Sequence, residues 1–278
     1  MYSDLYPELD SVVRQFVAAV QRALGENFFG AYLVGSLATG DFDLDSDVDF
    51  LVITVVELRE AELESLCAVH LAVHALGSYP AEHLEGSYIP IESLNRADSV
   101  GTEPLWYVDN GRTSLERSVH DNQWHVRWIL RERGIAVAGP APKTFVRAVA
   151  TEALRAEAAA AIVTLRNHVA VGLDATAGWF NTRFGQSFAV LSCCRMLHTC
   201  ETGEVQSKHA GAKWAERALA PAWRDLIQAA WTERHDVRFG EKVRQPAEAA
   251  MVQETARFLA YAQDRIRATP SSPREPER

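Results

Sequence analysis

The chain has 278 residues, 47% of them hydrophobic and 23% charged, and its 28 basic and 37 acidic side chains give a net charge of −9. This composition is that of an ordinary globular protein, and the acidity argues against nucleic acid as the main partner, because phosphate contacts need a basic surface. An acidic surface instead suits a small, positively charged ligand.

Membrane and secretory signals are missing from the sequence pattern. No apolar run approaches the ~18 residues of a membrane-spanning helix, and the N-terminal residues lack the pattern of a signal peptide. The four cysteines, Cys67, Cys193, Cys194 and Cys200, have neither zinc nor redox spacing. We therefore expect a cytoplasmic protein with structural thiols and no membrane partner, and a monomer is the default expectation.

Residues 1–143 mix strand and helix patterns, which predicts an α+β domain. Residues 7–24 place apolar side chains at helical spacing on one face, and Gly25 to Asn27 end that helix. His70 and His74 are four apart but lack the glutamate of a metalloprotease pattern, so we interpret them as ordinary helix residues. The other predicted elements are a strand over 28–34, a helix over 55–76, a strand over 82–91, a loop or hairpin over 100–113, a helix over 114–133 and a short strand within 135–143.

The stretch 35–53, GSLATGDFDLDSDVDFLVI, carries the chemistry of this domain. Asp47 and Asp49 open an apolar strand, and side chains at i and i+2 of a strand share a face. Two carboxylates ~4 Å apart repel by roughly 4 kcal/mol at an effective dielectric of ~20, which a magnesium ion relieves. Gly35 permits a tight turn and the close approach of a ligand, and Ser36 would lie at a helix start that favours phosphate. The stretch predicts a metal clamp beside a phosphate cradle.

This pattern, Gly-Ser followed after ten residues by Asp-x-Asp between apolar runs, resembles the DNA polymerase beta-type nucleotidyltransferases. Within them, YLVGSLATGDFDLDSDVDFLVI is similar to the streptomycin/spectinomycin-type aminoglycoside adenylyltransferases. The resemblance implies an N-terminal domain with a mixed sheet and helices, followed by an all-α domain. It also implies transfer of AMP from ATP with Mg²⁺, and it adds Ser46 to Gly35 and Ser36 as a nucleotide-binding residue.

A third carboxylate is implied by the same resemblance. In that family it follows a leucine on the next strand, and Leu84-Glu85 matches this short pattern. Glu85 would then contact the metal with Asp47 and Asp49 and act as general base on the acceptor hydroxyl. Glu82, in the opposite phase of the strand, is the fallback, and a solvated glutamate at a strand edge is the alternative.

The sequence after residue 143 changes to alanine-rich helical patterns, which places a domain boundary near 143–146. We expect a helical domain over 146–268 that closes the nucleotide and acceptor cleft, and a disordered tail over 269–278. Thr202-Gly203 should end one buried helix. The predicted helices cover residues 146–172, 186–201, 207–219, 221–234 and 246–267.

Two cations in this helical region match the family pattern of Arg, then Thr-Gly, then Lys. They are Arg195 and Lys208 in CCRMLHTCETGEVQSKHAGAKWA, and by resemblance they would contact the triphosphate. A departing polyanion needs such charge neutralisation, although a buried arginine paired with a carboxylate of the first domain is the alternative.

The acceptor segment departs from the family. Streptomycin-type enzymes have acidic and aromatic residues just before this buried helix, whereas AGWFNTRFGQS offers Trp179 and Phe180 but no carboxylate after Asp174. Asn181 is a candidate substitute. The function we expect is adenylylation of a small cationic acceptor, such as an aminoglycoside. A protein or tRNA acceptor and a non-catalytic nucleotide sensor remain as alternatives.

Overall fold

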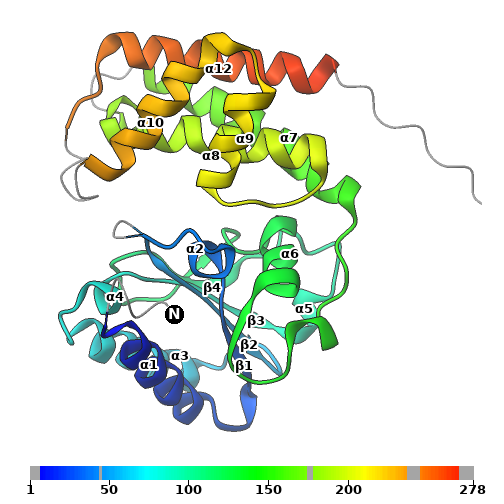
Figure 1. The fold of residues 1–278 in the computed structure, drawn as a ribbon. Coiled ribbons are helices and arrows are strands. Elements are labelled where there is room, and N and C mark those ends of the chain that lie inside the picture. The colour runs from blue at the N-terminus through cyan, green and yellow to red at the C-terminus, as the bar shows by residue number, and fades with distance from the viewer. Residues whose placement is uncertain (1–6, 44–45, 174–177, 237–244, 269–278) are drawn as a thin grey trace, which may run out of the picture. The chain divides into compact units, whose positions relative to one another are not determined.

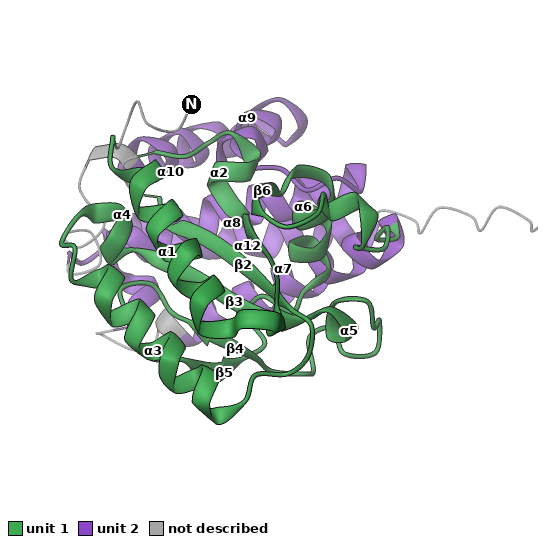
Figure 2. Cartoon of the chain, turned by 90° about the horizontal axis from the view of Figure 1, so that it is seen from below, with its two compact units in different colours: residues 1–150 green, residues 151–278 purple. Residues whose placement is uncertain are grey.

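The computed structural model describes residues 7–43, 46–173, 178–236 and 245–268. The chain divides into two compact units, residues 1–150 and 151–278 (Figure 2). The boundary therefore lies a few residues beyond the expected 143–146. Arg131 Nη1 donates hydrogen bonds to the carbonyls of Lys143 and Val146, which holds this segment on the first unit. The predicted tail over 269–278 lies outside the described residues.

Unit 1 contains a six-stranded mixed sheet, as expected. The strand order is β5-β4-β3-β2-β1-β6, with β2 and β3 parallel and the other neighbours antiparallel. The predicted α+β class is thus confirmed. The strands are β1 (Phe28–Leu33), β2 (Val48–Thr54), β3 (Leu84–Pro90), β4 (Leu105–Val108), β5 (Glu116–Ser118) and β6 (Ile135–Ala138).

Helices α1 (Leu9–Leu24) and α3 (Glu60–His74) pack on one face of this sheet (Figure 1). The apolar stripe predicted for the first helix is buried throughout. Val48, Phe50 and Val52 of β2 belong to the same core. Because neighbouring strand residues point to opposite faces, the aspartates beside them face away from α1 and α3. Short helices near the strand ends are α2 (Gly35–Thr39), α4 (Tyr79–Glu82) and α5 (Ile91–Leu94).

The helix predicted over 114–133 is wrong in its first half. Residues 116–118 form β5, which pairs antiparallel with β4, and α6 starts only at Trp124 and ends at Arg133. Pairing with the sheet outweighs local helix propensity for these residues, and Gln123 has extended backbone angles (φ −127°, ψ 157°) that mark the helix start. The predicted turn before them is present, with Gly111 at φ +73°.

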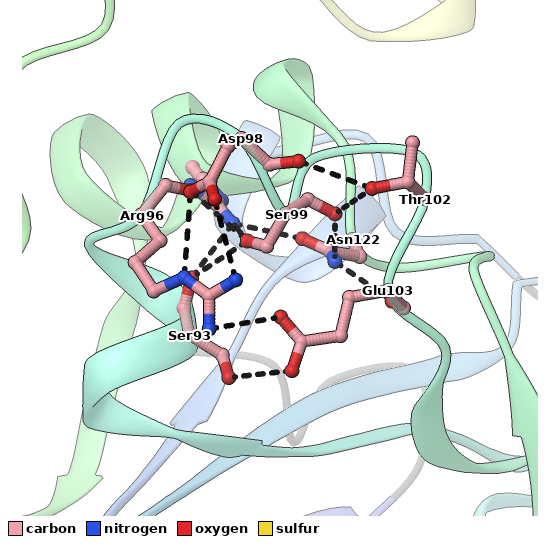
Figure 3. A network of polar contacts seen from close by, with 8 residues as sticks. Ser93, Arg96, Asp98, Ser99, Thr102, Glu103 and Asn122 are labelled. Carbon is pink, nitrogen blue, oxygen red and sulfur yellow. Dashed lines mark hydrogen bonds and ion pairs between the residues drawn. The ribbon is translucent and has the colours of Figure 1, made fainter.

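The backbone carbonyls of the loop between α5 and β4 accept hydrogen bonds from side chains at the start of α6 (Figure 3). Asn122 Nδ2 donates to the carbonyls of Ser99 and Glu103, each at 2.8 Å. The buried guanidinium of Arg127 on α6 donates to the carbonyls of Arg96 at 2.7 Å and Ser93 at 2.9 Å. These bonds tie the loop to the start of α6 and satisfy polar groups that burial would otherwise leave without partners.

Unit 2 is helical, which confirms the second part of the predicted fold class. Helix α8 carries the buried Cys193 and Cys194 and contacts the other long helices. It ends at Gly203, which has φ +76°. No helix of the described residues is both long and apolar enough to cross a membrane. In the described part of this unit the α-helices are α7 (Thr151–Leu173), α8 (Arg183–Thr202), α9 (Lys208–Ala218), α10 (Arg224–Asp236) and α12 (Ala249–Ala268).

Candidate active site

The glycine-serine turn and the second aspartate meet at the end of β1. The Val34 amide donates to the Asp49 carbonyl at 3.0 Å. Gly35 has φ +56°, and a Cβ on it would lie only 1.8 Å from Asp49 Oδ2. The Asp49 carboxylate therefore lies directly against the Gly35 backbone, which explains why this position lacks a side chain.

The Asp47 carboxylate lies just before β2 and is held from a distant turn. Asn110 Nδ2 donates to Asp47 Oδ1 at 2.6 Å. His83 Nδ1 lies 2.7 Å from Asn110 Oδ1, and the rings of His83 and Tyr79 lie 4.0 Å apart. Asp47 is thus held by a side chain from the turn after β4, and that side chain is held by the residue before β3.

Glu85 lies beside Asp49, because the parallel register of β2 and β3 pairs these two positions. Its side chain is 15% exposed, so it is not the solvated edge glutamate of the alternative interpretation. Tyr107 OH donates to Glu85 Oε1 at 2.6 Å, and His120 Nε2 lies 3.4 Å from the same oxygen. The fallback residue, Glu82, belongs to α4 rather than to the strand, which begins only at Leu84.

Burial is the main influence on the pKa of this carboxyl group. Desolvation raises the pKa of Glu85, the hydrogen bond from Tyr107 and the proximity of His120 oppose that rise, and Asp121 and Asp109 add to it. Asp121 also has a raised pKa, mainly because of burial, and its Oδ2 accepts a hydrogen bond from Ser87 Oγ at 2.7 Å. Glu85, Asp109 and Asp121 thus form a cluster of carboxylates, which favours a cationic ligand or metal.

The two predicted serines differ in their surroundings. Ser36 Oγ is buried and makes no hydrogen bond within the part of the chain that the structure describes. Ser46 Oγ donates to Asp43 Oδ1 at 2.7 Å and accepts from the Asp43 amide at 3.0 Å. Ser46 therefore shapes the loop before Asp47, a local role that the resemblance did not indicate.

Of His120, Asp121 and Trp124, which follow β5 in the chain, only the first two contact residues of the site. His120 and Asp121 lie in the turn between β5 and α6 and face Glu85 and Ser87, whereas the Trp124 ring lies 5.4 Å from the Arg127 guanidinium. Sequence reasoning missed Tyr107 and Asn110. Their signals were weak: Tyr107 shares a strand face with Asp109, and Asn110 belongs to a turn motif.

The two predicted cations belong to neighbouring helices of unit 2. A Cβ on Gly211 would lie 2.7 Å from Arg195 Cα, so α9 packs closely on α8 at this position. Lys208, one turn before Gly211, has its Nζ 5.1 Å from the centre of the Phe188 ring. Both cations are partly buried.

The segment before α8 is rich in aromatic side chains. The Trp179 ring makes edge-to-face contacts with Phe180 and with Phe184 and Phe188 of α8, and the residue is 40% exposed. Asn181 contributes its carbonyl to a hydrogen bond from the Ala247 amide at 2.7 Å. Asp174 lies outside the described residues.

The residues present fit a magnesium ion carried with a nucleotide. Within the described ranges, no three His, Cys, Asp or Glu side chains are arranged to hold a metal by themselves, so Asp47, Asp49 and Glu85 do not form a complete protein cage. Magnesium usually takes one or two carboxylates together with phosphate and water oxygens, and Asp47 and Asp49, two residues apart in the sequence, are donors of that kind.

Comparisons with known proteins identify two domains and a related fold. Residues 13–93 match the model of the nucleotidyltransferase domain, and residues 155–262 match the model of the aminoglycoside adenylyltransferase C-terminal domain. The structure is similar to the crystal structure of spectinomycin adenyltransferase AAD(9) from Enterococcus faecialis with ATP and spectinomycin. The TM-score is 0.67 and the identity 14%, over 92% of this chain and 99% of that chain. This likeness shows a common fold. No match was found among curated proteins.

Proposed function

We propose, from the premise that the chain is a nucleotidyltransferase related to the aminoglycoside adenylyltransferases, that it uses Mg²⁺ to transfer AMP from ATP to a hydroxyl of a small cationic acceptor. The proposed acceptor is an aminoglycoside-type antibiotic, so that the reaction confers resistance. The observation that carries the proposal is the meeting of Gly35, Asp49 and Glu85 at one end of the sheet in a nucleotidyltransferase domain.

The nucleotide would be held by the turn and the aspartate pair. Ser36 Oγ is buried without a hydrogen-bond partner among the described residues, and a phosphate oxygen would satisfy it at the bend that Gly35 makes. Asp47 and Asp49 would hold Mg²⁺, which when bound neutralises phosphate charge. The ATP in the related AAD(9) structure supports ATP as the nucleotide.

Glu85 would act as the general base. An acceptor hydroxyl within hydrogen-bond reach would give its proton to the carboxylate as the oxygen attacks the α-phosphorus. Burial raises the pKa of Glu85, which strengthens it as a base because the best base titrates near the working pH. Arg195 and Lys208 would balance the charge of the leaving pyrophosphate, since fixed cations stabilise charge that develops on a leaving group.

The acceptor class rests on charge and on the relative. The net charge of −9 and the carboxylates around Glu85 favour a polycation. Spectinomycin is bound in the AAD(9) structure. The partly exposed Trp179 in the aromatic segment before α8 is suited to packing against a sugar or aminocyclitol ring.

The test is pyrophosphate release from ATP and Mg²⁺ across a panel of aminoglycosides that includes streptomycin and spectinomycin. We expect release with at least one of them, and we expect Asp47→Asn to abolish it while the melting temperature stays within a few degrees. Near-normal release by Asp47→Asn would contradict the metal assignment. Failure of the whole panel, with labelled ATP marking proteins or tRNA in a lysate, would replace the antibiotic by a macromolecular acceptor. Nucleotide binding without any transfer would indicate a sensor.

A further inference from the structure

Two of the proposed catalytic carboxylates receive hydrogen bonds from a single structural element. Tyr107 of β4 donates to Glu85, and Asn110 in the turn that follows β4 donates to Asp47. Each hydrogen bond has a donor–acceptor distance of 2.6 Å. Glu85 belongs to β3, and Asp47 lies just before β2. The two acceptors therefore come from different strands, whereas both donors come from β4 and its turn.

The Tyr107 bond has the geometry of a charge-assisted contact. The phenol has one proton, and Glu85 Oε1 at 2.6 Å is nearer than Asp109 Oδ1 at 3.2 Å. An O–H donor at this distance from a carboxylate is typical of hydrogen bonds to an ionised group. Tyr107 is 4% exposed and pairs with Ser87, two residues beyond Glu85. Diagonal neighbours of this kind lie within reach of an aromatic side chain.

The Asn110 bond spans more of the sheet. Strand β3 lies between β4 and β2, so the turn after β4 must pass over the start of β3 to reach Asp47. His83, just before β3, supports the turn with its Nδ1 at 2.7 Å from Asn110 Oδ1. With the carbonyl oxygen of the Asn110 amide engaged by His83, its NH₂ group is directed at Asp47.

We propose that Tyr107 and Asn110 are positioning residues, Tyr107 for the Glu85 carboxylate and Asn110 for the Asp47 carboxylate. This inference rests on the proposed function, in which Glu85 is the base and Asp47 a metal ligand. In this proposal each residue acts through the carboxylate to which it donates. Each removes the freedom of a carboxylate to rotate away from its working orientation, and a misplacement of about 1 Å at a reacting group typically lowers the rate about 100-fold.

Three variants test the proposal. Tyr107→Phe and Asn110→Ala each delete one donor. Tyr32→Phe is the matched control, because the Tyr32 hydroxyl donates to the Pro140 carbonyl at 2.9 Å and not to a carboxylate of the site. Crystal structures of the three variants give the carboxylate positions. Pyrophosphate release with ATP, Mg²⁺ and the aminoglycoside panel gives kcat and KM, and Mg²⁺ titrations of the rate give the metal requirement.

We expect Tyr107→Phe to lower kcat by about 10- to 100-fold, because the variant loses a hydrogen bond to a charged group. The KM for ATP should stay within about twofold of the wild type. Asn110→Ala should raise the Mg²⁺ concentration for half-maximal rate, and Tyr32→Phe should change neither. In the crystals, Glu85 and Asp47 should each rotate in the matching variant.

Carboxylates that stay in place would overturn the proposal, as would rates equal to those of Tyr32→Phe. If the wild type transfers AMP to no acceptor, the proposed function fails, and the crystal structures alone then decide the positioning roles.

Discussion

Gly35→Ala is the sharpest perturbation of the candidate site. The new methyl group would lie 1.8 Å from Asp49 Oδ2 and 2.4 Å from Asp49 Cγ, far inside a normal contact. The Asp49 carboxylate would have to retreat by roughly 1 Å or more to restore van der Waals separation. A shift of that size at a metal-binding group corresponds to about a 100-fold loss of rate.

The backbone adds a separate cost. Gly35 has φ +56°, a left-handed conformation that costs a residue with a Cβ about 1 to 2 kcal/mol. Gly40, five residues later, separates the two effects. It has φ +81°, and nothing lies within 4 Å of the Cβ position. Gly40→Ala therefore carries the same kind of backbone strain without the collision.

The assays follow from this pairing. Urea unfolding should show both variants destabilised by about 1 to 2 kcal/mol, while pyrophosphate release should fall about 100-fold only in Gly35→Ala. The stabilisation of each variant by Mg²⁺ and ATP, measured as a shift in melting temperature, should be lost in Gly35→Ala alone. Equal activity in the two variants would refute the reasoning, because Asp49 would then tolerate displacement or would not bind the metal.

Two predictions concern the fold rather than the site. His70 is buried with its Nε2 2.8 Å from Tyr88 OH, and burial lowers its pKa to about 4. An unfolded histidine has a pKa of ~6.5, so between pH ~6.5 and ~4 the His70 imidazole is protonated in the unfolded state and neutral in the folded state. The free energy of unfolding should therefore fall by about 3 kcal/mol as the pH drops from ~6.5 to ~4. Urea unfolding of His70→Asn should lack this component, and parallel pH curves for the two proteins would exclude it. Arg127→Met should destabilise the chain by more than about 3 kcal/mol, because the buried Ser93 carbonyl and the partly buried Arg96 carbonyl lose their donor. The exposed Arg133→Met is the control, and equal urea midpoints would contradict the prediction.

Local patterns were sufficient for most elements of the chain. The apolar stripe of residues 7–24 predicted the buried face of α1, and Gly203 ended α8 where expected. Both features depend on neighbours in the sequence, through helical periodicity and through the left-handed conformation that glycine adopts readily. The error over 114–133 arose where β5 gains its hydrogen bonds from β4, which helical periodicity within one segment does not reveal.

The same distinction holds for the candidate site. The sequence by itself determined the turn at Gly35, the spacing of the aspartate pair and the family that this stretch resembles, because these lie within nineteen consecutive residues. Only the tertiary structure decided that Glu85 lies beside Asp49, and that Tyr107 and Asn110 hold the carboxylates. Those contacts depend on strand register and on a turn that crosses β3. Register and crossing are set by packing between distant segments, which no local spacing of residue types encodes.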